Sequence, residues 1–222
     1  MGPKETISLF QHRFVPRAAG PRGGAGPSPL TLLLLHGTGG DENDLLSLGP
    51  LLAPGAALLS PRGRVLENGM PRFFRRFAEG ILDVEDLKFR AKELADFVRA
   101  AKIEYSLTDS PLFAVGFSNG ANIAAGILLV EPGLLDGAVL LRAMVPFEPD
   151  APPPLTGKRV LLAAGRRDPY SGPEQTERLR KILESGGAEV TVHWSNVGHA
   201  LVQEDVDAAA AWLTRARPGG GS

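Results

Sequence analysis

The chain has 222 residues, of which 43% are hydrophobic and 22% charged, and this composition argues against a disordered chain and against a coiled coil. Its 24 basic and 25 acidic side chains nearly balance, so we expect neither nucleic acid nor a membrane surface as a partner. Cysteine is absent, which excludes disulfides, a thiolate nucleophile and cysteine-ligated metals, and which fits a cytoplasmic location.

Short apolar segments alternate with helical patterns along the chain. Residues 7–15 alternate loosely and predict an antiparallel edge strand, the Pro- and Gly-rich residues 18–29 predict a surface loop, and residues 61–79, rich in arginine and aromatic side chains, predict another loop. Buried strands are predicted at 30–35, 56–59, 112–115, 138–141, 160–164 and 190–194, and helices at 85–101, 121–129, 175–183 and 205–216.

Strands that alternate with helices predict an α/β fold, with a mostly parallel central sheet and helices on both of its faces. We expect residues 1–217 to form a single domain, because no Pro- or Gly-rich segment divides the chain into two parts of useful size. No insertion is large enough for a separate lid domain. Residues 218–222, Pro-Gly-Gly-Gly-Ser, predict a flexible tail outside the fold.

Ser118 lies in Gly116-Phe117-Ser118-Asn119-Gly120, directly after a predicted strand and at the start of a helix rich in small residues. A serine on such a strand-to-helix turn has a strained backbone and a hydroxyl exposed above the sheet. The flanking glycines are expected because a side chain there would collide with the neighbouring strand and helix. Ser118 is therefore the candidate nucleophile, and the bland alternative is a Gly-rich turn that happens to contain serine.

A serine nucleophile needs a base, and four histidines are available. His12 lies on the predicted edge strand, His193 lies inside a strand, and His36 is interpreted as a structural residue beneath a loop. Only His199 lies in a loop between the last strand and the last helix, where its imidazole can reach the carboxyl edge of the sheet. His199 is therefore the candidate base.

The acid is expected on a loop between the serine and the histidine, because that is the chain order in this type of hydrolase. Asp168 follows the strand predicted at 160–164 and is the candidate, with a turn-capping aspartate as the bland alternative. Glu148 and Asp150 follow another strand and are its rivals.

An acyl-transfer site also needs donors for the negative charge that develops on the carbonyl oxygen. The backbone N–H of Asn119, next to the nucleophile, is the first expected donor. The second is assigned to Thr38, in the loop His36-Gly37-Thr38-Gly39, with Gly39 as the near alternative.

Residues 41–44, Asp-Glu-Asn-Asp, lack the ligand spacing of a calcium loop. We interpret them as residues that cap a helix, and no metal site is expected.

Taken together, the segments around His36, Ser118, Asp168 and His199 resemble the phospholipase/carboxylesterase family of α/β-hydrolases, which includes the acyl-protein thioesterases. The segment Glu67 to Arg76 is similar to that of the small bacterial carboxylesterases in the family. The resemblance runs from about Phe10 to Leu213. The sequence departs from the family pattern at Ser171, at residues 195–197 and at Ala200, which puts the substrate preference in doubt.

The resemblance implies a carboxylesterase that hydrolyses short- to medium-chain esters of small molecules through an acyl-enzyme, without a metal or an organic cofactor. It suggests that Met70, Phe73, Phe74 and Met144 line the acyl pocket, and that the chain forms a homodimer. Arg72, Arg75 and Arg76 are interpreted as solvated loop residues rather than as ligands of an anionic substrate group. Two alternatives stay open: a thioesterase or lysophospholipase-like acyl hydrolase, and a catalytically silent binding scaffold.

Overall fold

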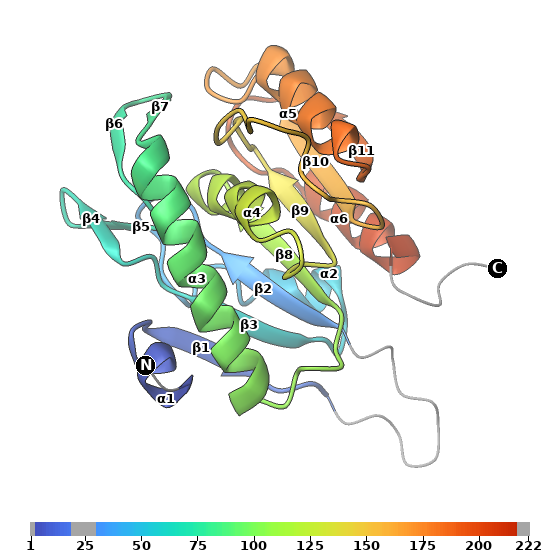
Figure 1. The fold of residues 1–222 in the computed structure, drawn as a ribbon. Coiled ribbons are helices and arrows are strands. Elements are labelled where there is room, and N and C mark those ends of the chain that lie inside the picture. The colour runs from blue at the N-terminus through green and yellow to red at the C-terminus, as the bar shows by residue number, and fades with distance from the viewer. Residues whose placement is uncertain (1–2, 19–29, 217–222) are drawn as a thin grey trace.

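The computed structural model describes residues 3–18 and 30–216 (Figure 1). A seven-stranded sheet forms its centre, and its strands follow the order β1-β3-β2-β8-β9-β10-β11. These strands are β1 (His12–Val15), β2 (Thr31–Leu35), β3 (Ala57–Pro61), β8 (Leu112–Phe117), β9 (Gly137–Leu141), β10 (Arg159–Gly165) and β11 (Glu189–Ser195). Only β1 pairs antiparallel, at one edge of this sheet. The fold is thus the predicted α/β fold with a mostly parallel sheet.

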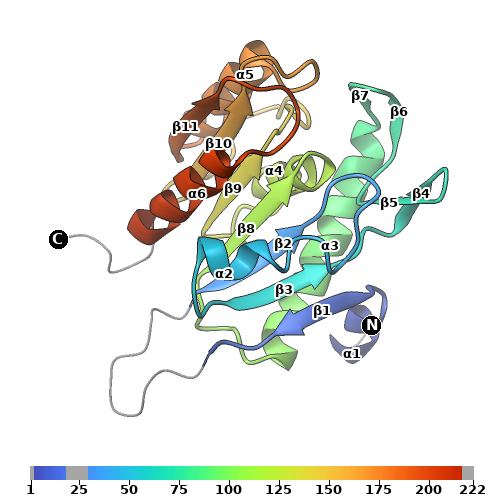
Figure 2. The same ribbon diagram turned by 180° about the vertical axis from the view of Figure 1, so that it is seen from behind.

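Helices cover both faces of the sheet. Figure 1 shows α3 (Val84–Glu104), α4 (Asn119–Val130) and α5 (Pro173–Ser185) on one face, and Figure 2 shows α2 (Leu48–Leu52) and α6 (Gln203–Ala216) on the other. The short helix α1 (Pro3–Ser8) packs against α3. The four predicted helices are all present, with ends that differ by a few residues from the prediction.

The central strands are apolar throughout because helices bury them from both sides. In β2, Leu33 and Leu35 belong to the core beneath α3 and α4, while Leu32 and Leu34 belong to the core beneath α2 and α6. This alternation follows the two-residue period of a strand. The continuous run of leucines therefore marks a strand with two buried faces.

Three predictions need correction. Residues 7–15 do not form one strand, because α1 extends to Ser8 and β1 begins only at His12. The predicted loop 61–79 holds one hairpin and most of another: β4 (Val65–Glu67) with β5 (Met70–Arg72), and β6 (Arg76–Ala78) with β7 (Ile81–Leu82). Most of the loop predicted at 18–29, and the whole tail 218–222, lie outside the described residues.

The acidic residues 41–44 do not cap a helix, because turns follow them and α2 begins only at Leu48. Glu42 is instead almost fully buried and pairs with Arg62, whose Nε lies 2.5 Å from the Glu42 carboxylate. Asp41 contacts the same guanidinium at 3.3 Å. The acidic cluster thus fixes the start of the segment that leads to the two hairpins.

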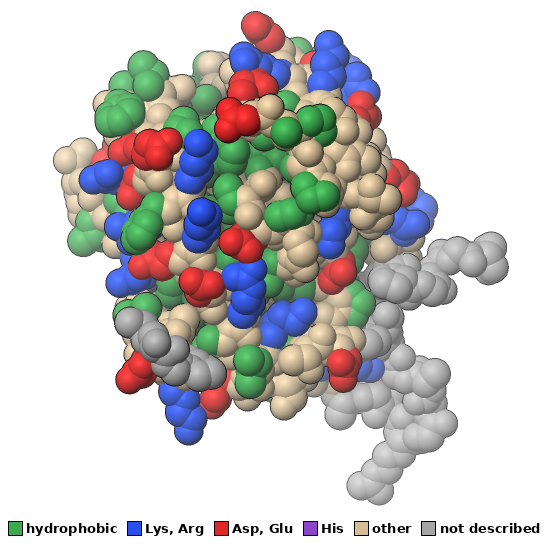
Figure 3. Space-filling model, viewed as in Figure 1, with side chains coloured by type: hydrophobic (Ala, Val, Ile, Leu, Met, Phe, Trp, Pro, Cys, Tyr) green, Lys and Arg blue, Asp and Glu red, His purple; other side chains and the backbone are tan. Residues whose placement is uncertain are grey.

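On the face seen in Figure 3, acidic and basic side chains are interspersed rather than gathered into one patch of a single sign. Within the described residues, no helix is both long and apolar enough to cross a membrane.

Candidate active site

Ser118 forms the turn between β8 and α4. Its backbone has φ 52° and ψ −113°, a conformation that is strained for a residue with a side chain. A Cβ on Gly116 would lie 2.4 Å from the Gly120 carbonyl oxygen, and one on Gly120 would lie 2.0 Å from the Leu35 carbonyl oxygen. The turn therefore needs both glycines for packing, as predicted.

The other two members of the predicted triad reach Ser118 from two further loops. His199 follows β11, and its Nε2 lies 2.8 Å from Ser118 Oγ. Asp168 follows β10, and its Oδ2 lies 2.8 Å from His199 Nδ1. Because parallel strands end at the same edge of the sheet, three segments far apart in the sequence meet above it.

The Asp168 carboxylate is held by a dense set of hydrogen bonds. Ser171 Oγ donates to Oδ2 at 2.6 Å, and the Tyr170 and Ser171 backbone N–H groups donate to Oδ1 at 2.9 and 3.1 Å. Burial favours the neutral acid, but these bonds and the one from His199 outweigh it and lower the pKa of Asp168 below its ordinary value. Asp168 is therefore ionised at neutral pH and can orient His199.

The rival residues lie elsewhere. His36 is buried, with Nδ1 2.6 Å from the Gly37 carbonyl oxygen and Nε2 accepting from the Gly63 N–H at 2.9 Å, which fits the predicted structural role. His12 bonds to Tyr105. Glu148 pairs with Arg178 on the surface.

The two predicted donors have no acceptor among the described residues. The Thr38 N–H lies in its loop without one, and the Asn119 N–H is the first of α4, where a helix leaves its N–H groups unpaired. The Gly39 N–H, the alternative considered above, donates to the Pro71 carbonyl oxygen at 2.9 Å, which favours Thr38 over Gly39.

Residues 71–73, at the end of β5 and just after it, contact the segments that carry both donors. Pro71 accepts from Gly39, as described, and Arg72 Nη1 donates to Thr38 Oγ1 at 2.6 Å. The Phe73 N–H donates to Asn119 Oδ1 at 2.8 Å. Residues 71–73 thus contact both the Thr38 loop and the start of α4, although sequence reasoning placed them in a loop with no such role.

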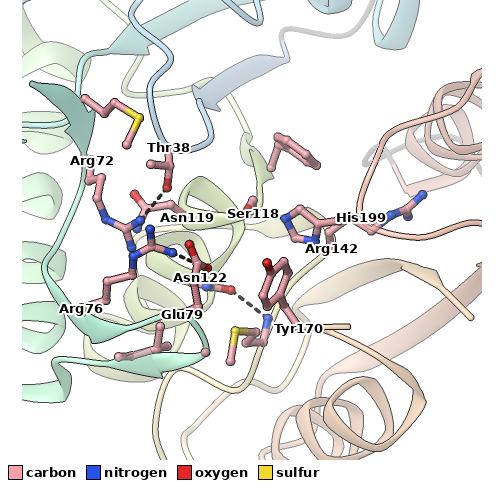
Figure 4. Close-up of a pocket in the computed structure, with 15 residues that line it drawn as sticks. Thr38, Arg72, Arg76, Glu79, Ser118, Asn119, Asn122, Arg142, Tyr170 and His199 are labelled. Atoms are coloured by element: carbon pink, nitrogen blue, oxygen red, sulfur yellow. Dashed lines mark hydrogen bonds and ion pairs between the residues drawn. The ribbon is translucent and has the colours of Figure 1, made fainter. Parts of the chain in front are cut away.

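A cavity of about 330 Å³ opens beside Ser118 and His199 (Figure 4). Met70 and Met144 line it, as predicted. Phe73 and Phe74 do not, because both belong to the core and are only 3% and 0% exposed. The apolar wall is completed by Leu82, Phe117 and Tyr170, which sequence reasoning missed.

No family model matches the sequence, but comparisons with individual proteins do give matches. The chain is 46% identical to the putative hydrolase MhqD of Bacillus subtilis over 191 residues, which is 86% of this chain and 96% of MhqD. It is also 44% identical to a carboxylesterase of Bacillus cereus, with a TM-score of 0.88 over 98% of this chain and 100% of that one. The chain belongs to the phospholipase/carboxylesterase family of α/β-hydrolases. A protein of unknown function from Agrobacterium tumefaciens shares 39% identity and a TM-score of 0.83, covering 96% of this chain and 99% of that one.

Three of the positions at which the sequence was expected to depart from the family pattern lie close to the triad. Ser171 bonds to Asp168, as described above. Ser195 Oγ accepts from Arg142 Nη2 at 3.1 Å, and the Ala200 carbonyl oxygen accepts from the same nitrogen at 2.9 Å. Ser171 and Ser195 thus form these bonds through their side chains and Ala200 through its backbone, at the end of β11 and in the loops that carry Asp168 and His199.

Arg142 is the functional-site residue that sequence reasoning missed most completely. It follows β9, has a φ of 60° and is only 1% exposed, yet it also lines the cavity. Its guanidinium pairs with Asp205 of α6, with Nη2 2.5 Å from Oδ2, and both side chains are fully buried. The pair ties the His199 loop to the end of β9.

No cluster of His, Asp or Glu side chains suited to a metal ion occurs among residues 3–18 and 30–216.

Proposed function

We propose that the protein is a serine carboxylesterase that hydrolyses short- to medium-chain carboxylic esters. The observation that carries this proposal is the continuous chain of contacts from Ser118 Oγ through His199 to Asp168, with both hydrogen bonds at 2.8 Å. The carboxylesterase from Bacillus cereus supports the same class of reaction. The cavity of about 330 Å³ lies at the small end of ligand sites, which favours short chains.

In the proposed mechanism, His199 Nε2 takes the proton of Ser118 as Oγ attacks the ester carbonyl carbon. The resulting oxyanion accepts hydrogen bonds from the Thr38 and Asn119 N–H groups. The C–O bond to the alcohol then breaks, and His199 gives its proton to the leaving oxygen. Water then attacks the acyl-enzyme as His199 takes its proton. The bond between the carbonyl carbon and Ser118 Oγ breaks, His199 returns the proton to Oγ, and the acid leaves. Asp168 keeps the Nδ1–H tautomer of His199 and stabilises its charged form.

The test is hydrolysis of p-nitrophenyl esters from acetate to dodecanoate by the parent protein and by Ser118→Ala. We expect the rate to peak at short chains in the parent and to fall on the order of 10⁴-fold or more in the variant, because the nucleophile is lost. Circular dichroism of the variant controls for folding. Full activity in Ser118→Ala would contradict the mechanism, and cleavage of acyl thioesters alone would favour a thioesterase.

A further inference from the structure

The wall of the cavity beside Thr38 carries two guanidinium groups. Arg72 and Arg76 both line the cavity, and Figure 4 shows their guanidinium groups next to each other, across the cavity from His199. The Arg72 side chain is 4% exposed and that of Arg76 17%, so neither is the solvated loop residue that the sequence suggested. Two adjacent positive charges repel each other strongly away from water, so the groups that stabilise them need to be identified.

Negative charge in this wall is concentrated on Arg76. Its Nε lies 2.9 Å from Glu67 Oε1, and its Nη1 lies 2.5 Å from Glu79 Oε2. Burial lowers the pKa of Arg76, but the contacts with Glu67 and Glu79 outweigh that effect and raise it overall. Arg76 therefore has two carboxylate partners, one of which it shares with Arg72.

Arg72 is less well balanced. Its only ion pair within the described residues is with Glu67, at 3.2 Å, and Glu67 also serves Arg76. Burial and then the charge of Arg76 lower the pKa of Arg72 below its ordinary value. Arg72 is thus the more weakly paired of the two guanidinium groups, although Glu67 and Glu79 together balance their two charges.

One donor at this wall is also unused. Arg72 bonds through Nε to the Phe74 carbonyl oxygen and through Nη1 to Thr38, and among the described residues its Nη2 donates to no other group.

We propose that Arg72 forms a carboxylate subsite, so that the substrate is a short ester bearing a free carboxylate. The unpaired Nη2 of the guanidinium can donate a charge-assisted hydrogen bond to a carboxylate oxygen. Arg72 touches Thr38, which places this carboxylate a few atoms from the reacting carbonyl. The substrate class is a half-ester of a short dicarboxylic acid, and this assignment rests on the proposed esterase function.

The test compares monoethyl succinate with ethyl 4-methylpentanoate, a neutral ester in which an isopropyl group replaces the carboxylate. Acid release gives kcat/KM for each, and the ratio of the two values is the readout. We expect the parent to prefer the half-ester and Arg72→Gln to lower the ratio about tenfold or more, as loss of a charged hydrogen bond implies. If Arg72 only supports Thr38, both esters lose activity equally and the ratio stays unchanged, which overturns the proposal.

Two further variants keep the test sharp if Arg72→Gln folds poorly. Glu79→Gln, at an exposed position of the cavity wall, removes a competing carboxylate and is expected to raise the ratio. Arg75→Gln is the matched control, because Arg75 is 63% exposed, does not line the cavity and pairs with Asp83 and Asp86. It is expected to leave the ratio unchanged. An unchanged ratio in Glu79→Gln, or an equal shift in Arg75→Gln, contradicts the subsite.

A binding measurement separates failure of the subsite from failure of the proposed function. Calorimetry with the Ser118→Ala protein and monoethyl succinate should detect binding, which Ser118→Ala/Arg72→Gln should lose. If the protein hydrolyses the neutral ester, shows no preference for the half-ester and does not bind monoethyl succinate, the subsite is wrong. The proposed esterase function then still holds. If monoethyl succinate binds in an Arg72-dependent way but neither ester is hydrolysed, the proposed esterase function is wrong. The subsite then still holds.

Discussion

At the residue scale, the triad depends on the hydrogen bonds that hold the Asp168 carboxylate. Ser171→Ala removes the 2.6 Å hydrogen bond to Oδ2 and so raises the pKa of Asp168 toward its ordinary value. We expect kcat to fall, because His199 is less firmly oriented, and the free energy of unfolding at neutral pH to fall by about 1.5–3 kcal/mol.

The pH dependence of this effect has a definite sign. A carboxylate whose pKa is lowered in the folded state adds stability above its unfolded pKa, about 3.9, and this stability is lost as the pH falls through the folded value. Ser171→Ala reduces that contribution, so its acid unfolding should begin at a higher pH than in the parent. Circular dichroism between pH 7 and 2 measures the midpoint. A midpoint that moves to lower pH would contradict the assignment.

Sequence reasoning selected the three residues of the proposed triad from their place in the chain, and the structure brings their side chains together. Ser118, Asp168 and His199 each follow a strand, and that pattern is visible without coordinates. Arg142 was missed because its meaning depends on Asp205, 63 residues away on another element. A single arginine after a strand carries no local signal of a buried ion pair.

At the element scale, the close packing of the start of α4 against the end of β2 fixes the position of Ser118. A Cβ on Gly120 would meet the Leu35 backbone at 2.0 Å, and backbone cannot move as a side-chain end can. We expect Gly120→Ala to lower the free energy of unfolding by more than about 3 kcal/mol, or to abolish soluble expression. Gly133→Ala is the control, since nothing lies within 4 Å of its added Cβ. Urea unfolding of both variants measures the difference, and equal stability would refute the packing argument.

The elements that were predicted poorly are the short ones. Strands β2, β8, β9 and β10 are continuous apolar runs, and burial on both faces explains why they are recognisable. The strands of the two hairpins have only two or three residues each, too few to show a two-residue period. The segment is rich in arginine and aromatic side chains, and this composition suggested a loop.

At the scale of the whole molecule, the buried pair of Arg142 and Asp205 joins the sheet, α6 and the His199 loop. Asp205→Ala would leave a buried guanidinium without its counter-charge, and we expect it to lower the free energy of unfolding by about 3–5 kcal/mol. It should also lower kcat, because Arg142 holds the Ala200 carbonyl next to His199.

The double variant Arg142→Leu/Asp205→Leu tests whether this loss comes from the unpaired charge. Removing both charges should cost less than Asp205→Ala alone, because no buried ion remains without a partner. Urea unfolding of the three proteins gives the comparison. A double variant that is less stable than Asp205→Ala would show that the pair stabilises the fold in its own right.

The base and the tip of the hairpin of β4 and β5 differ in how many changes of sequence they can tolerate. Its base, residues 71–73, contacts both proposed oxyanion donors, whereas its tip at Asn68 and Gly69 has positive φ values, and a Cβ added at Gly69 would meet nothing within 4 Å. Insertions at the tip can therefore change the surface near the cavity while the reaction geometry stays fixed, although a side chain at Gly69 itself would be strained by its φ of 81°. In an evolving lineage, or in a mutant library, new substrate ranges should arise at the tip, and changes at the base should mostly be lost to selection.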